Sequence, residues 1–227
     1  AESSDQPEGT FLLQDVHRGW PELPTGAIKR LRIVQVLPKA TPHINAPTVG
    51  LPNASPGRQV LGTVPVEPDG SAYFRVPAQT PIAVQPLDAE GKAVQQMRSW
   101  FTAMPGETLS CVGCHEAQTA SAPNRRTRAL AQAPADITPW RGPTRGFNFA
   151  REVQPVLDRH CVRCHNGQPQ ADGKSLCDLR GTEKIKDWRS ITPGHGGANA
   201  GKFSVSYAEL HRHVRRPGIE SDYHLLE

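Results

Sequence analysis

Short runs in which branched apolar residues alternate with polar ones fill the first half of the chain. Four such runs are separated by turn-forming sequences: residues 27–37, 60–66, 71–76 and 81–87. Pro68-Asp69-Gly70 lies between the second and third runs, which predicts a hairpin at that point. Short strands with closely spaced turns are typical of an antiparallel β-sandwich. The N-terminal part is therefore expected to be mainly β with irregular loops and sandwich-like.

The pattern changes to helical spacing in the second half. Residues 149–160 are expected to form a helix because their apolar positions fall on one face: Phe149, Val153, Val156 and Leu157. Pro155 should shorten or kink that helix. A second short helix is expected over residues 207–214, with Ser206 as its N-cap. The Ala-, Pro- and Arg-rich stretch before these helices indicates an irregular connector.

Composition indicates a loop-rich chain with a thin protein core. The 227 residues include 20 glycines and 22 prolines, only 6% are aromatic, and the mean hydropathy is −0.51. The formal net charge is +4, and the arginines do not gather on one predicted helix. Nucleic-acid binding is therefore not expected. No apolar run approaches the length of about 18 residues that a membrane span needs, so no span is expected.

The cysteines carry the most specific signal. Four of the five fall in two copies of one pattern, Cys111-Val112-Gly113-Cys114-His115 and Cys161-Val162-Arg163-Cys164-His165. C-x-x-C-H is the attachment sequence of c-type haem. Two thiols on one turn can each form a thioether with a porphyrin vinyl group, and the next residue presents its imidazole to the iron. The sequence therefore predicts two covalent haem c groups, held by these four cysteines, with His115 and His165 as iron ligands.

Paired cysteines have two other common uses, a zinc site and a redox pair, and both fit this sequence less well than haem attachment. A four-cysteine zinc site usually has about 15–20 residues between its pairs, whereas 46 residues separate Cys114 from Cys161 here. A zinc site also gives no reason for a histidine at the same offset in both copies. A thioredoxin-like redox pair would need a strand–CxxC–helix setting, but turn-like residues precede Cys111. Cys177, outside both motifs, is interpreted as a buried or idle thiol.

Haem attachment has consequences for location and organisation. Haem c is attached outside the cytoplasm, so a periplasmic or otherwise extracytoplasmic location is expected. The macrocycles would also supply apolar surface that the thin core lacks. We expect a β-rich domain with the first haem motif over residues 1–124, an irregular connector over residues 125–150, and a small, mostly helical cytochrome c-like segment with the second motif over residues 151–227. The last segment is expected to be incomplete at its C-terminus.

Several segments resemble hydrazine synthase alpha-subunit-like proteins. Residues 61–77, 97–100 and 105–116 resemble the β-rich region of that family, and the segment around the first haem motif is the most specific. Residues 153–165, together with 201–204 and 215–224, are similar to the cytochrome-like segment that follows. The resemblance implies a dihaem protein and possible redox chemistry on a small nitrogen species, although likeness of fold does not by itself establish that chemistry.

One departure from the family concerns an iron ligand. Relatives often have a tyrosine, an unusual haem-iron ligand in the synthase, in the segment that matches residues 15–19, where this chain has His17. The resemblance therefore makes His17 a candidate ligand of the first haem. An imidazole there would favour a six-coordinate electron-transfer haem.

The sixth iron positions have further candidates. His195 lies between glycines that would let the backbone approach a macrocycle, and His224 is a candidate for the second haem. Met97 and Met104 flank the first haem segment, and methionine ligation would raise the reduction potential. His211 and His213 are expected to be exposed by default.

Three functions remain open. The first is electron transfer by a dihaem c-type cytochrome to a redox partner protein, with other subunits of a larger complex as further candidate partners. The second is a haem-dependent oxidoreductase acting on a small nitrogen species, which needs an iron with an open position. The third is a binding module in which the haems serve structure. No catalytic residue outside the haem sites is predicted, because the sequence contains no phosphate-binding loop and no HExxH motif.

Overall fold

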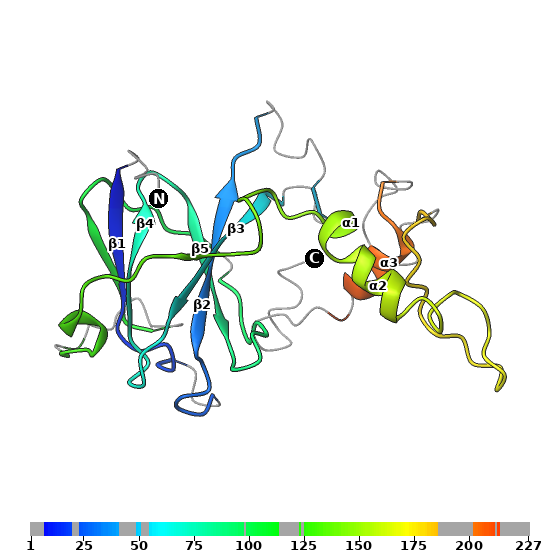
Figure 1. The fold of residues 1–227 in the computed structure, drawn as a ribbon, viewed down its shortest axis with the longest axis horizontal. Helices are drawn as coiled ribbons and strands as arrows, with labels where there is room; N and C mark the ends of the chain where they lie inside the picture. Colours follow the sequence, from blue (N-terminus) through cyan, green and yellow to red (C-terminus); the bar gives the residue numbers. More distant parts are fainter. Residues whose placement is uncertain are drawn as a thin grey trace. The chain divides into compact units, whose positions relative to one another are not determined.

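The computed structural model divides the chain into two compact units (Figure 1). The first unit comprises residues 1–38 and 58–146, and the second comprises residues 39–57 and 147–227. The structure describes residues 7–19, 23–40, 49–50, 55–97, 99–113, 123, 125–185, 202–211 and 213.

Two sheets make up the described part of the first unit. In the first sheet, β1 (Glu8–Leu13) lies between β4 (Ala72–Pro77) and β6 (Thr108–Cys111). The second sheet has the order β5 (Ile82–Leu87), β2 (Arg30–Leu37), β3 (Gly57–Pro65) and β7 (Thr138–Pro139). The expectation of a mainly β N-terminal part is confirmed.

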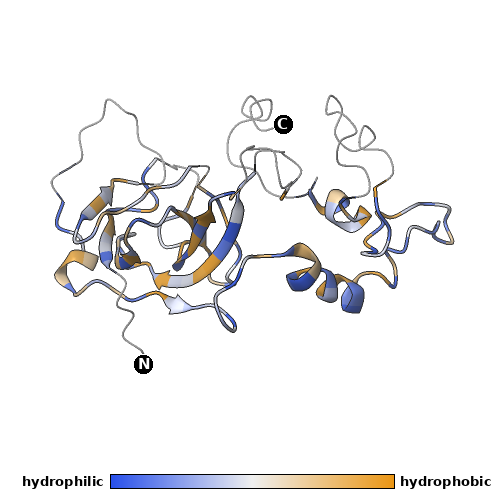
Figure 2. Ribbon diagram, turned by 90° about the horizontal axis from the view of Figure 1, so that it is seen from above, coloured by the Kyte–Doolittle hydropathy of each residue, from blue (hydrophilic) through white to orange (hydrophobic). Residues whose placement is uncertain are grey.

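The two sheets share one hydrophobic core. Each sheet contributes alternate residues of its strands, as a strand with one buried face should: Phe11, Leu13, Phe74 and Val76 from the first sheet, and Leu31, Ile33, Val64 and Ile82 from the second. The Phe11 ring stacks on Phe101 at a centroid distance of 4.2 Å and lies 5.4 Å from the Phe74 ring. Figure 2 shows this hydrophobic colouring on the strands of the first unit.

The strand pairing differs from the expected hairpin. The turn forms, because the Gly70 amide donates to the Glu67 carbonyl at 2.8 Å, and Gly70 has the positive φ of 83° that favours glycine. However, β3 and β4 on either side of it belong to different sheets. β4 pairs with β1 instead, with Phe11 opposite Phe74. The hairpin prediction was wrong because turn residues determine where the chain reverses, not which sheet each strand joins.

One pairing is also parallel rather than antiparallel. β6 runs parallel to β1, with Leu13 opposite Cys111. β2 to β5 come between β1 and β6 in the sequence, so β6 can pair in this direction without a tight turn. This register places Cys111, the last residue of β6 and the first of the motif, beside Leu13, where β1 leads into residues 14–18.

The described part of the second unit contains three short helices. These are α1 (Phe149–Glu152), α2 (Gln154–His160) and α3 (Val205–His211). The expected helix over residues 149–160 is interrupted at Val153, and Pro155 occupies the first turn of α2, where its missing N–H is tolerated. The Ser204 hydroxyl, rather than Ser206, accepts the Tyr207 amide at 3.2 Å. Among the described residues, no helix has the length and apolar character to cross a membrane.

Candidate functional site

The second haem motif continues directly from α2. The Cys164 amide donates to the Cys161 carbonyl at 3.1 Å, and the His165 amide donates to the same carbonyl at 2.9 Å. The backbone therefore makes one more turn, which carries both thiols and the imidazole. Cys161 is half-buried, Cys164 is exposed, and both are free thiols. This turn has the donor set and the accessibility that two thioether bonds to one porphyrin require.

The imidazole of His165 is held through one ring nitrogen. Its Nδ1 lies 3.1 Å from the carbonyl oxygen of Cys177. Because a carbonyl can only accept, Nδ1 carries the proton and Nε2 keeps its lone pair. A backbone carbonyl on the second ring nitrogen is a common partner of a metal-bound histidine, since it fixes the tautomer and the ring orientation. The residues of the second motif therefore fit a haem whose iron is bound by Nε2 of His165.

Gln154 holds the segment that contains Cys177. This side chain is only 7% exposed, and its Nε2 donates to the Leu179 carbonyl at 3.0 Å and to Asp158 Oδ1 at 2.8 Å. Its Oε1 accepts the Ser206 hydroxyl at 2.6 Å. Gln154 thus ties α2, the segment after Cys177 and α3 together. The Leu179 amide completes the arrangement by donating to the His165 carbonyl at 3.0 Å.

Charged groups stiffen the same segment. Arg180 makes a forked contact with Asp178, with Nη2 2.7 Å from Oδ2 and Nε 3.0 Å from Oδ1. These hydrogen bonds hold the pKa of Asp178 below its ordinary value. Burial, followed by the negative charge of Glu209, raises the pKa of the Cys177 thiol. The Cys177 thiol is therefore neutral at neutral pH, and its Sγ lies 3.2 Å from Nδ1 of His165.

The first haem motif is described as far as Gly113, and Cys114 and His115 lie outside the described residues. Cys111 ends β6, and its carbonyl accepts the Gln14 amide at 3.0 Å. The Val112 carbonyl accepts the Asp15 amide at 3.2 Å. Gly113 approaches Arg18 so closely that a Cβ would collide with the Arg18 carbonyl. Residues 14–18 therefore lie directly against the first motif, which is where the sequence placed His17.

Both ring nitrogens of His17 have protein partners. Nδ1 lies 3.2 Å from Asp15 Oδ1, and Nε2 accepts the Gly26 amide at 3.1 Å. Asp15 is held in turn by Arg125 at 3.1 Å. The Nε2 lone pair that would bind iron is thus occupied by an N–H group, so iron ligation by His17 would require the Gly26 bond to break. Ligation by His17 stays a prediction, and His195 and His224 lie outside the described residues.

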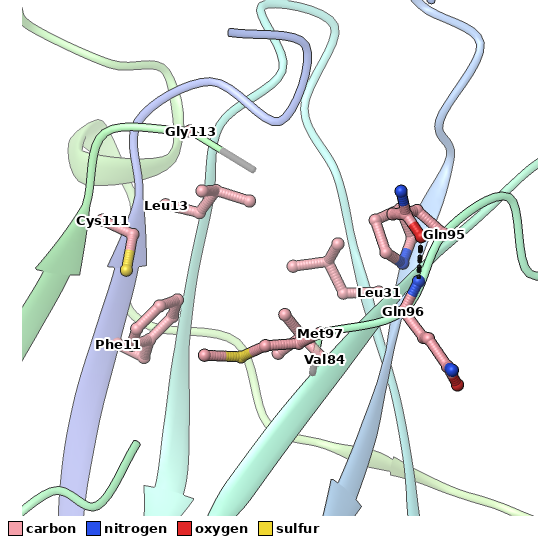
Figure 3. A pocket seen from close by; sticks show the side chains of 10 residues that line it. Phe11, Leu13, Leu31, Val84, Gln95, Gln96, Met97, Cys111 and Gly113 are labelled. Carbon is pink, nitrogen blue, oxygen red and sulfur yellow. Dashed lines mark hydrogen bonds between the residues drawn. The ribbon is translucent and has the colours of Figure 1, made fainter. Parts of the chain in front are cut away.

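A cavity of about 290 Å³ opens beside Cys111 in the first unit. Cys111 and Gly113 contribute from the motif, and apolar side chains from both sheets form the walls: Phe11, Leu13, Leu31, Val84 and Pro86. Met97, Gln95 and Gln96 complete the lining, and Figure 3 shows the Met97 side chain among these residues. Met104, by contrast, is 52% exposed. The structure therefore places Met97 at the cavity and Met104 at an exposed position, although the sequence made both candidate ligands.

Sequence reasoning missed the cavity and the roles of Gln154 and Cys177. The Cys177 carbonyl is a backbone group, so no residue type could have indicated it. Gln154 lay on a predicted helix as one polar residue among several. Among the described residues, no group of three or more histidine, cysteine, aspartate or glutamate side chains is placed to share a metal ion.

Two comparisons with known proteins find a similarity to hydrazine synthase. Residues 26–116 match the model of the hydrazine synthase alpha subunit middle domain, a range that runs from before β2 to just after the first haem motif. A structure of Kuenenia stuttgartiensis hydrazine synthase is similar in fold, with a TM-score of 0.64 and 20% sequence identity over 90% of this chain. This chain spans about a third of that chain's length, 34%. A search of curated proteins finds no match.

The chain is thus a mainly β protein with two C-x-x-C-H motifs. More particularly, residues 26–116 are similar to the hydrazine synthase alpha subunit middle domain, and the resemblance expected from the sequence is confirmed.

Proposed function

We propose that the protein is an extracytoplasmic dihaem c-type cytochrome that transfers electrons through two covalently attached haems. The observation that carries the proposal is the second motif, where Cys161 and Cys164 share one turn and the Nδ1 proton of His165 is donated to the Cys177 carbonyl. When bound, the haem iron supplies a one-electron redox couple. The second copy of the motif, at Cys111, Cys114 and His115, supports a second haem.

The described part of the second unit exposes apolar side chains and has a small core cluster. Its described core cluster has only Ile185 and Ala208 fully buried, with Phe203 and Tyr207 packed against them. Val156 is 55% exposed and Leu176 is 39% exposed. Exposed apolar side chains together with a small core are what a cytochrome c-like segment would present without its haem. These features support the proposal that the haem completes the core of this unit.

A second candidate function is favoured by the family match. The protein could be a haem-dependent oxidoreductase acting on a small nitrogen species, because residues 26–116 match the hydrazine synthase alpha subunit middle domain. This function needs one iron with an open or displaceable sixth position. Electron transfer instead favours two six-coordinate haems. A redox partner protein is proposed in either case, and other subunits of a larger complex would fit the second.

We expect the purified protein to contain two covalent haems per chain. A pyridine haemochrome assay should return two, and the haem stain should stay with the protein band on a denaturing gel. Cys177→Ala is the matched control, because it removes a thiol outside both motifs and should leave the count at two. A count of one or none in the wild-type protein would contradict the proposal.

Carbon monoxide added to the ferrous protein separates the two functions. Two low-spin haems whose visible spectra do not change would support electron transfer. A large change in one haem would identify an open iron and favour the oxidoreductase.

A further inference from the structure

We propose that the cavity beside Cys111 receives the first haem and that the Met97 sulfur is the sixth ligand of its iron. The inference rests on the proposed haem attachment at the first motif. It goes beyond that function by assigning a binding surface and a ligand.

The position of Cys111 brings the macrocycle to this cavity. Cys111 is the first thiol of the motif, and it belongs to the cavity wall. Figure 3 shows the Cys111 sulfur and the Phe11 ring on the same side of the first sheet. A porphyrin bonded to this sulfur would begin at the cavity wall, because Cys111 is part of that wall. The cavity is therefore the apolar surface that an attached macrocycle reaches first.

The lining suits a porphyrin better than a charged small molecule. Among the described residues that line the cavity, none has a charged side chain, and the amides of Gln95 and Gln96 are the strongly polar groups. The volume of about 290 Å³ is at the low end of the range for ligand pockets, about 300–1,000 Å³. It would take part of a macrocycle, leaving the charged propionates in water. Burial of the apolar part removes it from water at about 25 cal/mol per Å².

Met97 is placed to offer its sulfur to this site. The Met97 amide donates to the Val84 carbonyl at 3.1 Å, which fixes the residue beside β5. Its half-buried side chain lines the cavity opposite β1, and Figure 3 shows the sulfur in the space between Phe11 and Val84. A thioether is a soft ligand for haem iron. The Nε2 lone pair of His17 already accepts the Gly26 amide, so it is not available to bind iron. This favours the Met97 sulfur as the iron ligand.

The test replaces each candidate ligand in the full chain. Met97→Leu keeps an apolar side chain of similar size and removes the sulfur. Met104→Leu is the matched control at an exposed position, and His17→Gln tests the competing ligand. We expect Met97→Leu to keep two haems by the pyridine haemochrome assay. It should lose the methionine-to-iron charge-transfer band of the ferric protein, lower one reduction potential and open one ferrous haem to carbon monoxide. The other two variants should leave all of these unchanged.

A second measurement is made on the wild-type protein and does not require Met97→Leu to contain haem. The chain contains only two methionines, so selective labelling of their methyl groups gives two assignable resonances. In the ferrous wild-type protein, the ring current should shift the methyl resonance of an iron-bound methionine far upfield, and Met104→Leu should leave that resonance in place. Two methyl resonances at ordinary positions would overturn the inference.

The remaining outcomes separate this inference from the proposed function. An unchanged spectrum and unchanged potentials in Met97→Leu would overturn the assignment of Met97 while the haem count of two upheld the function. Loss of the low-spin spectrum in His17→Gln alone would assign the ligand to His17 and overturn the inference. A double variant, Cys111→Ala with Cys114→Ala, whose haem count is no lower than that of the wild-type protein would overturn both.

Discussion

Replacing both Cys161 and Cys164 with alanine is expected to reduce the haem content from two to one per chain and to unfold much of the second unit. The thioether bonds are the covalent attachment, so the double substitution removes it completely. The described core cluster of this unit is small, with Ile185 and Ala208 fully buried. A ligand that binds only the folded state stabilises it, and its loss lowers the free energy of unfolding accordingly.

Two measurements distinguish the loss of a haem from the loss of folded structure in the second unit. The pyridine haemochrome assay counts haems, and amide hydrogen exchange reports protection in residues 147–185 against protection in the strands of the first unit. Protection should fall in the second unit and stay unchanged in β1 and β2, which pack into the core around Phe74. Cys177→Ala serves as the control. Full protection of residues 147–185 in the double variant would show that this unit folds without its haem.

The sequence predicted those features of the sites that depend on residues close together in the chain. The C-x-x-C-H spacing works within one turn, and the structure places Cys161, Cys164 and His165 on such a turn. Pro155 was expected to disturb its helix, and the helix is interrupted one residue before α2 begins. The strands were found from their alternation, which is also a local property. Each of these features depends on residues a few positions apart.

The part that the sequence did not predict depends on distant contacts. Gln154 meets Leu179 across 25 positions and Ser206 across 52. The cavity needs β1, β2, β5 and β6 to be assembled before its lining residues meet. The expected hairpin failed for the same reason, since β4 pairs with β1, where Phe74 lies opposite Phe11, and not with its neighbour in sequence. Propensity and spacing contain no information on these choices.

His17 shows how a resemblance can indicate the right region without fixing a role. The sequence placed this residue next to the first haem, and residues 14–18 do lie against Cys111 and Val112. The hydrogen bonds of the ring to Asp15 and Gly26 give His17 a structural part in that loop. Met97, in contrast, lies between β5 and β6 in the sequence and lines the same cavity as Cys111. Iron ligation by either residue would bear on function, because it would close the position that an oxidoreductase needs open.

Gln154→Ala is expected to destabilise the second unit by about 1–3 kcal/mol, the usual cost of leaving a buried hydrogen-bonding group without its partner. The Leu179 carbonyl would lose its donor, and Ser206 would lose its acceptor. Because Leu179 and Cys177 belong to one segment, the carbonyl that orients His165 would also lose part of its support. Chemical denaturation of the holoprotein should report the loss of stability, and the potential of one haem should shift while that of the other stays constant.

The matched control is Gln168→Ala, which shortens the same side chain at an exposed position of the same unit and should change stability by less than about 0.5 kcal/mol. A double-mutant cycle with Ser206→Ala then isolates the buried contact. If Gln154 and Ser206 act through their hydrogen bond, the double variant should be less destabilised than the sum of the single variants by about 0.5–1.5 kcal/mol. Additive effects would mean that the two residues stabilise the unit independently. An unchanged haem potential in Gln154→Ala would show that the Cys177 carbonyl is held at His165 without Gln154, by the Leu179 amide and the Asp178–Arg180 pair.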